Sequence, residues 1–422
     1  MESPSGPPAG VPIPPSPAPI PPLEASAKAI SGSARDGVRA FSEGDYQRAA
    51  VFFRKALADE PENPVLKNNL AQSLSALGWQ EFEKADYSRS EELFNQAFEL
   101  KSDPAFLKGV LYSQVRLDKQ KEAEKTFEGI SGDREARSAL KGLFLRLGQR
   151  QYKSGNMDDA VGYFEKALSL DPSDTALSAA VENIRSDRKS EEGFGEKKGS
   201  HFTVRFAEKE DVVTGHLIGL LLEEAYYKIG AEIGYYPEDK ITAVLYPGER
   251  FRDITMAPSW AGALYDGKIK IPSGGITERT ALLEKVIFHE YTHAAVHGIS
   301  KGRAPVWLNE GLAQYLEGKR VAKDYRMALK DAIPSSGSIS LKQFEGSFTG
   351  LTEKEAYFAY ALSLSATEYL IREFGIFSAK KILEGVSDGD TLDEAFSSSI
   401  YQSFGQFEDG WYRYLKRDSP SG

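Results

Sequence analysis

The sequence predicts a multidomain protein in which an all-α repeat solenoid is followed by an α+β domain. Its 422 residues are too many for one hydrophobic core. Small and aromatic residues recur at helical spacings over residues 30–174, which indicates internal repeats. From His201 onward the pattern changes, because strand-like segments come first and long helical segments follow, as in α+β domains.

Composition excludes several classes of function. Lys and Arg number 52 against 62 Asp and Glu, a net charge of −10, whereas nucleic-acid binding favours the opposite balance. Cysteine is absent, which excludes disulfides, thiolate zinc sites and cysteine nucleophiles, so any metal chemistry must use Asp, Glu and the five His. No apolar run approaches the ~20 residues of a membrane span, so no transmembrane segment is predicted.

Residues 1–28 are predicted to be a proline-rich, disordered tether. The first 22 residues contain ten prolines and no apolar signal core, so no targeting peptide is visible. Such a tract favours an extended polyproline conformation. Two interpretations stay open. Exported bacterial proteins often carry such a tether after a removed signal, which favours the cell envelope or periplasm, whereas an inert tail leaves a cytoplasmic protein as the alternative.

Residues 29–186 are predicted to form helical repeats, with a long helix from Pro64 to about Lys84 and a degenerate copy over 105–138 that places Ala123 and Phe127 on its second helix. These spacings resemble the tetratricopeptide repeat, a helical hairpin in which small residues lie where two helices touch. The matching positions are Gly37, Gly44, Tyr46, Ala49, Phe53, Ala56 and Pro61 in one copy, Gly148, Gly155, Met157, Ala160, Phe164, Ala167 and Pro172 in another, and Gly78, Ala85, Tyr87, Ser90, Phe94 and Ala97 in a third.

Stacked hairpins bury a continuous core and leave a concave face open. A peptide or protein partner on that face is the functional interpretation, and a rigid spacer is the alternative. After a capping helix over 175–186, residues 187–200 are rich in Lys, Glu and Gly and are predicted to be an interdomain linker.

The α+β domain is predicted over residues 201–417. Strands are expected at His201–Phe206, Ile241–Tyr246 and Ala261–Ile271, with a helix over Val212–Ile233 after the first. Further helical segments are expected at 278–297, with Thr277 as N-cap, and at 305–317, 353–374 and 392–415.

The helix at 278–297 carries the residues for metal chemistry. His289 and His293 are four residues apart, so they project from one helix face about 6 Å apart along the axis, where two imidazoles can share a zinc ion. Glu290 is turned about 100° from His289 and can accept a proton from a zinc-activated water molecule. The apolar run Val286–Phe288 places the motif in a core, which argues against a surface helix with two incidental histidines.

A catalytic zinc needs a third protein ligand. His297 lies about 12 Å along the same helix from His289 and is predicted to be a helix-terminal residue. Glu310 is the predicted ligand, because the sixteen residues between it and His293 allow a turn and an antiparallel return helix. Glu317, two turns further on, is predicted to be either a solvated carboxylate or one that supports a ligand.

His289-Glu290-Tyr291-Thr292-His293, followed by Trp307-Leu308-Asn309-Glu310-Gly311-Leu312-Ala313-Gln314-Tyr315, resembles the gluzincin signature of zinc aminopeptidases and bacterial peptidase MA-like domains. Such domains often follow tetratricopeptide repeats. The resemblance covers roughly residues 200–417 and implies a zincin-like metallopeptidase fold, with zinc held by His289, His293 and Glu310.

In this family a downstream Tyr stabilises the oxyanion of the tetrahedral intermediate. Tyr360 is the residue that the resemblance implies, because a small residue follows it three positions on. A packed aromatic ring is the alternative interpretation of Tyr360, and Tyr357 is the second choice for the role.

The sequence departs from the family pattern in two places. Ala261–Asp266 falls where related aminopeptidases carry Gly-Ala-Met-Glu-Asn, and Tyr265 replaces the Glu that holds a substrate α-amino group. This replacement favours an endopeptidase, although the strand can still hold substrate backbone by β-augmentation. Some gluzincins orient a zinc-bound His with an acid one turn after the third ligand, where this chain has Gln314.

The predicted function is therefore zinc-dependent hydrolysis of peptide bonds by metal-activated water, with Glu290 as proton acceptor and donor and Tyr360 at the oxyanion. The repeats are predicted to dock a protein substrate or partner. Two alternatives stay open: a protein-interaction scaffold with a catalytically inactive zincin domain, and a non-peptidase hydrolase built on the same zinc site.

Overall fold

The computed structural model describes residues 32–207, 212–247, 264–273, 276, 278–321, 329, 340–346, 348 and 351–417. The predicted tether, residues 261–263 and the predicted N-cap Thr277 lie outside these ranges. The described residues divide into two compact units. The first comprises residues 32–147 and 163–175, and the second comprises residues 148–162 and 176–417.

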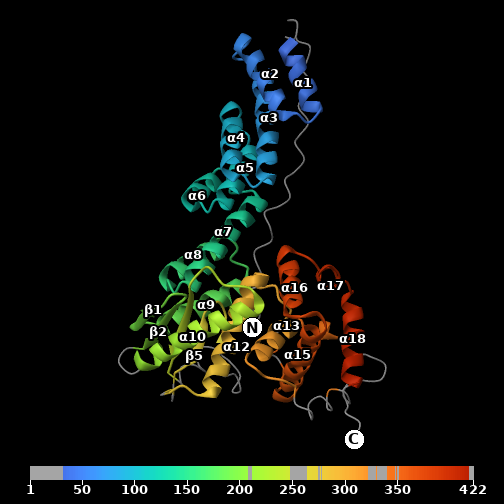
Figure 1. Cartoon of the computed structure of the whole chain (residues 1–422). Coiled ribbons are helices and arrows are strands. Elements are labelled where there is room, and N and C mark those ends of the chain that lie inside the picture. Colours follow the sequence, from blue (N-terminus) through green and yellow to red (C-terminus); the bar gives the residue numbers. More distant parts are fainter. Residues whose placement is uncertain are drawn as a thin grey trace. The chain divides into compact units, whose positions relative to one another are not determined.

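Helical hairpins build the first unit (Figure 1). Its helices are α1 (Gly32–Ser42), α2 (Tyr46–Asp59), α3 (Pro64–Glu83), α4 (Tyr87–Leu100), α5 (Pro104–Arg116) and α6 (Gln120–Glu128), with parts of α7 (Arg134–Lys153) and α8 (Met157–Leu170). The long helix predicted from Pro64 is α3, and Ala123 and Phe127 lie on α6 as predicted. The predicted all-α repeat architecture is confirmed.

Aromatic rings pack on glycines where the repeat helices cross. A Cβ atom at Gly37 would lie 2.8 Å from the ring of Phe53. One at Gly78 would lie 3.2 Å from the ring of Phe94, and one at Gly109 only 2.5 Å from it. Both rings are fully buried. The small residues of the repeat pattern therefore leave the space that the aromatic side chain of the neighbouring helix fills.

A mixed sheet forms one layer of the second unit. In the described residues its strand order is β1 (Phe194–Lys198), β2 (Phe202–Ala207), β3 (Ile241–Tyr246), β5 (Ile269–Pro272) and β4 (Leu264–Tyr265). β2, β3 and β5 are parallel, and β1 and β4 pair antiparallel at the two edges. The first two predicted strands are confirmed. The third is a hairpin in its described part, because the chain turns at Gly267 with φ of +109°.

The main core is formed by one face of this sheet together with a group of helices (Figure 1). They are α10 (Val212–Ile233), α12 (Ala281–Ser300), α13 (Val306–Leu316), α15 (Glu353–Phe374), α16 (Ile376–Asp388), α17 (Leu392–Ile400) and α18 (Phe404–Arg417), with a short 3-10 helix η1 (Leu341–Phe344). The sheet followed by helices confirms the predicted α+β class. The helix predicted over 392–415 is two helices, because the chain turns at Tyr401 with φ of +58°, and α16 was not predicted as a helix.

The structure differs from the linker predicted over residues 187–200. Helix α9 (Thr175–Ser190) extends into this range, and β1 pairs with β2. Asp187 and Glu191 are buried, at 4% and 2% exposure, and they pair with Lys270 on β5 and with Lys268 just before it, respectively. The predicted linker has a charged composition that is typical of solvated linkers, but its residues form part of the second unit. No helix in the described ranges has both the length and the apolar character needed to cross a membrane.

Candidate metal centre

Helix α12 carries two histidines on one face. Thr280 begins this helix by accepting a hydrogen bond from the backbone N–H of Leu283 at 3.1 Å. The ring centroids of His289 and His293 are 4.7 Å apart, with the ring planes at 87°. Their side chains are only 19% and 11% exposed. The four-residue spacing thus brings two imidazoles together in a mostly buried place.

Helix α13 brings Glu310 to both rings. Its Oε2 atom is 3.7 Å from Nε2 of His289 and 3.7 Å from Nε2 of His293. Atoms that share one tetrahedral zinc lie roughly 3.3–3.5 Å from one another, so these separations fit a zinc ion after small adjustments. Oε2 is buried and has no hydrogen-bond partner among the described residues, a costly state unless a cation compensates it.

Glu290 belongs to the same cluster. Its carboxylate lies within 4.8 Å of potential ligand atoms of His289 and His293, and its Oε2 is buried without a hydrogen-bond partner among the described residues. Burial raises the pKa of Glu290, and the two nearby rings oppose the rise. Glu290 follows His289 directly on α12, whereas Glu310 approaches from α13 with one oxygen equidistant from both rings. The cluster therefore offers two carboxylates near the rings, Glu290 from α12 itself and Glu310 from α13.

The second nitrogen of each ring has an oxygen partner from the α13 segment. His289 Nδ1 lies 2.8 Å from Glu317 Oε2, and His293 Nδ1 lies 2.9 Å from Asn309 Oδ1. When each Nδ1–H donates to these oxygens, both Nε2 lone pairs face Glu310. Of the two roles predicted for Glu317, the structure shows the supporting one. Asn309 was not predicted as a site residue, although it directly precedes Glu310 in the motif.

Gln314 occupies the place of the acid that some gluzincins use to orient a ring. Its amide Nε2 donates to the backbone oxygens of Glu310, at 3.2 Å, and of Tyr360, at 2.9 Å. It therefore ties α13 to α15 and does not contact either histidine. The side chain that contacts Nδ1 of His289 is Glu317. Glu317 lies two helical turns after Glu310, whereas the acid in those gluzincins lies one turn after the third ligand.

Negative charge gathers around His289. Burial favours the neutral ring of His289, but the hydrogen bond with Glu317 and the charges of Glu290 and Glu310 outweigh it and raise the pKa of His289 to about 9. A ring that retains a proton this strongly lies in a field that favours cations. Zinc bound at Nε2 would replace that proton.

Tyr360 lies on α15 near the two carboxylates. Burial, together with the negative charges of Glu310 and Glu290, raises its pKa. Its ring packs edge-on against Phe348 with centroids 5.5 Å apart. Tyr357, the second choice from the sequence, is 54% exposed. Of the two tyrosines, Tyr360 is therefore the one on which the charges of Glu310 and Glu290 act.

Residues 222–417 match the model of the peptidase MA superfamily. The second unit contains a peptidase MA domain. Tetratricopeptide-repeat models match residues 40–85 and 143–174, so the helical hairpins are tetratricopeptide repeats. No curated protein matches the chain.

His297 of the peptidase MA domain lies in the last turn of α12, as predicted, away from the ligand positions. Its Nε2 is 3.1 Å from Nζ of Lys153, and its ring centroid is 5.6 Å from that of Tyr265. Burial and the neighbouring Lys153 charge lower the pKa of His297 to about 4. The ring is therefore neutral and can accept a hydrogen bond from the ammonium group.

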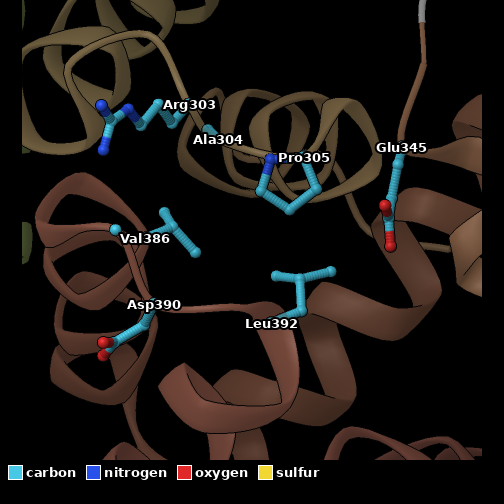
Figure 2. A pocket seen from close by; sticks show the side chains of 8 residues that line it. Arg303, Ala304, Pro305, Glu345, Val386, Asp390 and Leu392 are labelled. Atoms are coloured by element: carbon cyan, nitrogen blue, oxygen red, sulfur yellow. The ribbon is translucent and has the colours of Figure 1, made fainter. Parts of the chain in front are cut away.

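The peptidase MA domain also has a pocket of about 330 Å³ between the turn that precedes α13 and the turn that precedes α17. Figure 2 shows Arg303 at one end and Glu345 at the other, with Pro305 and Leu392 between them. The guanidinium of Arg303 donates to the backbone oxygen of Ser387 at 3.0 Å. None of the predicted site residues lines this pocket.

In the peptidase MA domain, Glu317→Gln is expected to lower zinc affinity about 10–100-fold, because the amide oxygen can still accept from His289 Nδ1 but carries no charge. Zinc affinity is measured by competition with a chromophoric chelator. Glu384→Gln on α16, at a side chain that is 50% exposed, is the control for loss of one negative charge. Equal zinc affinities for the two variants would contradict the role of Glu317.

Proposed function

We propose that the chain is a zinc-dependent metallopeptidase that cleaves internal peptide bonds. The observation that carries the proposal is the convergence of three potential ligand atoms: Nε2 of His289, Nε2 of His293, and Glu310 Oε2 at 3.7 Å from each. The carboxylate of Glu290 lies beside them. Two imidazoles and one carboxylate form a donor set typical of catalytic zinc, with one coordination position left for water or substrate.

His289, His293 and Glu310 would hold the zinc ion. The chemistry that zinc supplies at such a site is Lewis-acid polarisation of a carbonyl and a lowered pKa of water, towards about 7. Glu290 accepts the proton of the attacking water on its carboxylate and then delivers it to the nitrogen of the leaving amine. Tyr360 donates a phenolic hydrogen bond to the oxygen on which negative charge develops.

Two features support endopeptidase activity. Tyr265 on β4 is a neutral phenol whose pKa is raised by burial, so it offers no carboxylate for a substrate α-ammonium group. β4 is the edge strand in the described part of the sheet, and an extended substrate can add its backbone to such an edge. The tetratricopeptide repeats would dock a protein substrate or partner on their concave face.

The test compares wild-type protein with Glu290→Gln on casein as an unfolded substrate, with zinc content measured in parallel. We expect both proteins to bind one zinc ion, because Glu290 is not a ligand. Cleavage by Glu290→Gln is expected to fall by about 10²–10⁴-fold, because the isosteric amide cannot transfer the proton. Mass spectrometry of the new termini identifies the bonds that are cleaved.

The outcomes separate the alternatives. Full zinc content with no cleavage by either protein would favour a scaffold with an inactive zincin domain. Hydrolysis of ester substrates without cleavage of casein would indicate a non-peptidase hydrolase on the same site. Equal cleavage by both proteins would show that Glu290 does not transfer the proton.

A further inference from the structure

Buried charges lie on the face of the sheet opposite α12. Ile269 and Ile271 of β5 belong to the main core, so Lys270 between them and Lys268 just before the strand point to the other face. Their side chains are 0% and 4% exposed. Lys268 Nζ lies 2.8 Å from Glu191 Oε1, and Lys270 Nζ lies 2.7 Å from Asp187 Oδ2. These four residues are called the ionic seam.

Further polar groups contact the four residues of the ionic seam. Asp266, in the turn between β4 and β5, lies 2.9 Å from Lys270 Nζ. The hydroxyl of Tyr152 lies 2.7 Å from Asp187 Oδ2 and 3.0 Å from Asp266 Oδ2. Arg205 on β2 pairs with Glu191. Three carboxylates thus face three cations, and the net charge of the layer is balanced.

Stability alone does not require such a layer. Each ion removed from water carries a desolvation cost, and apolar residues of similar size often stabilise a fold as well or better. Charged pairs are directional, however, so they define which groups face one another. Here they join β5 and its turn to α9 and to the last turn of α7, which carries Tyr152.

The hairpin held in this way lies at an edge of the described sheet and contacts α12, the helix that carries His289 and His293. β4 pairs only with β5 in the described residues, and both strands contact α12. Tyr265 on β4 lies against His297 of α12, with ring centroids 5.6 Å apart. Lys153, which follows Tyr152 on α7, reaches the same His297 at 3.1 Å. The position of the hairpin relative to α12 therefore depends on groups from α7 and α9.

We propose that the ionic seam is a positioning device that holds the β4–β5 hairpin where its edge binds extended substrate. Asp187 and Lys270 are its central positioning residues. The role in substrate binding rests on the proposed peptidase function, whereas the hold on the hairpin does not. The ionic seam lies outside the metal centre, so weakening it should change substrate binding and leave zinc binding intact.

The experiment uses the full chain with Asp187→Asn, and Glu182→Gln as a control at an exposed site of the same helix. Hydrogen–deuterium exchange of the amides in residues 264–273 is expected to accelerate roughly tenfold or more in Asp187→Asn, because Lys270 loses one buried partner. Exchange in α12 and zinc content should stay at wild-type values. For casein cleavage, KM should rise severalfold while kcat changes less than about twofold.

The double variant Asp187→Asn/Lys270→Met is the second measurement. It removes both members of the pair and leaves Asp266, whose side chain is 34% exposed, to be solvated. We expect it to fold even if the single variant does not, and to recover part of the hairpin protection.

Unchanged exchange in residues 264–273 of Asp187→Asn would overturn the proposal, as would faster exchange with an unchanged KM. Exchange does not depend on cleavage. If the wild-type protein cleaves nothing, the proposed function is refuted. If hairpin amides nevertheless exchange faster in Asp187→Asn than in the wild type, the ionic seam still holds the hairpin.

Discussion

Glu310→Gln is expected to remove tight zinc binding and, with it, all zinc-dependent stabilisation. The carboxylate oxygen Oε2 lies 3.7 Å from both histidine Nε2 atoms. A neutral amide is a poor zinc ligand, and two imidazoles alone do not make a catalytic site. The loss of affinity should exceed the roughly 10–100-fold that removal of a ligand's supporting partner causes.

Thermal unfolding with and without zinc measures this effect. Zinc at about 1,000 times its dissociation constant should stabilise the wild-type protein by about 4 kcal/mol, and Glu310→Gln by almost nothing. In the metal-free protein the substitution removes an unpaired buried oxygen but also a charge that favours protonated His289, so we expect the free energy of unfolding to change less than the zinc-dependent part does.

Glu317→Gln is the matched control, since both glutamate side chains are 15% exposed and both belong to the α13 segment. At the same zinc concentration the control, with its affinity lowered roughly 10–100-fold, should retain about 1.4–2.7 kcal/mol of zinc-dependent stabilisation. Equal loss in the two variants would mean that Glu310 acts as a supporting group and that another residue completes the site.

Gly311→Ala is expected to destabilise the second unit by about 3 kcal/mol and to displace Glu310. A Cβ atom at Gly311 would lie 2.0 Å from Oγ1 of Thr367 and 2.5 Å from the backbone oxygen of Ser363, both on α15. A contact with backbone cannot be relieved by rotating a side chain, so α13 would have to move away from α15. The melting temperature should fall by roughly 6–12 °C.

Gly162→Ala on α8 is the control for a helical glycine in the same unit. A Cβ atom there has no neighbour within 4 Å, so alanine should stabilise the helix by up to about 1 kcal/mol. The two identical substitutions should therefore shift the melting temperature in opposite directions. If Gly311→Ala leaves the melting temperature and the zinc affinity unchanged, then α13 can move away from α15 without effect on the site, and the prediction is wrong.

Local periodicity predicted most of the elements. The helix over Val212–Ile233 and the strand over Ile241–Tyr246 have the predicted bounds, because α10 and β3 each follow one regular hydrophobic pattern. The helix predicted at 305–317 is α13, which begins at Val306 with Pro305 as its N-cap residue, as the preference of proline for helix starts predicts. Elements whose pattern was masked by Lys, Glu and Gly, such as β1 and the end of α9, were not predicted.

The candidate site was predictable where its members share one helix or one motif. The four-residue spacing of His289 and His293 places both rings on one face of any helix. Glu310 was predicted as the third ligand because the sixteen residues after His293 allow a turn and a return helix, and because the motif resembles that of gluzincins. The partners of the two Nδ1 atoms depend on how α13 lies across α12, and helix packing angles are not a property of spacing. For this reason the contact of Asn309 with His293 became visible only in the structure, and only the structure decided between the two roles predicted for Glu317.

The sequence by itself predicted which residues carry the proposed chemistry, because helical spacing and side-chain type are local properties. It also determined the order of the two architectures, repeats first and the α+β domain second. Tertiary structure decided which charges are paired and buried. Asp187 and Glu191 resemble solvated linker residues until Lys268 and Lys270, about eighty positions later, are found within hydrogen-bonding distance of them. Pairing over such a separation depends on the sheet register and on the helices that cover it, which no local pattern specifies.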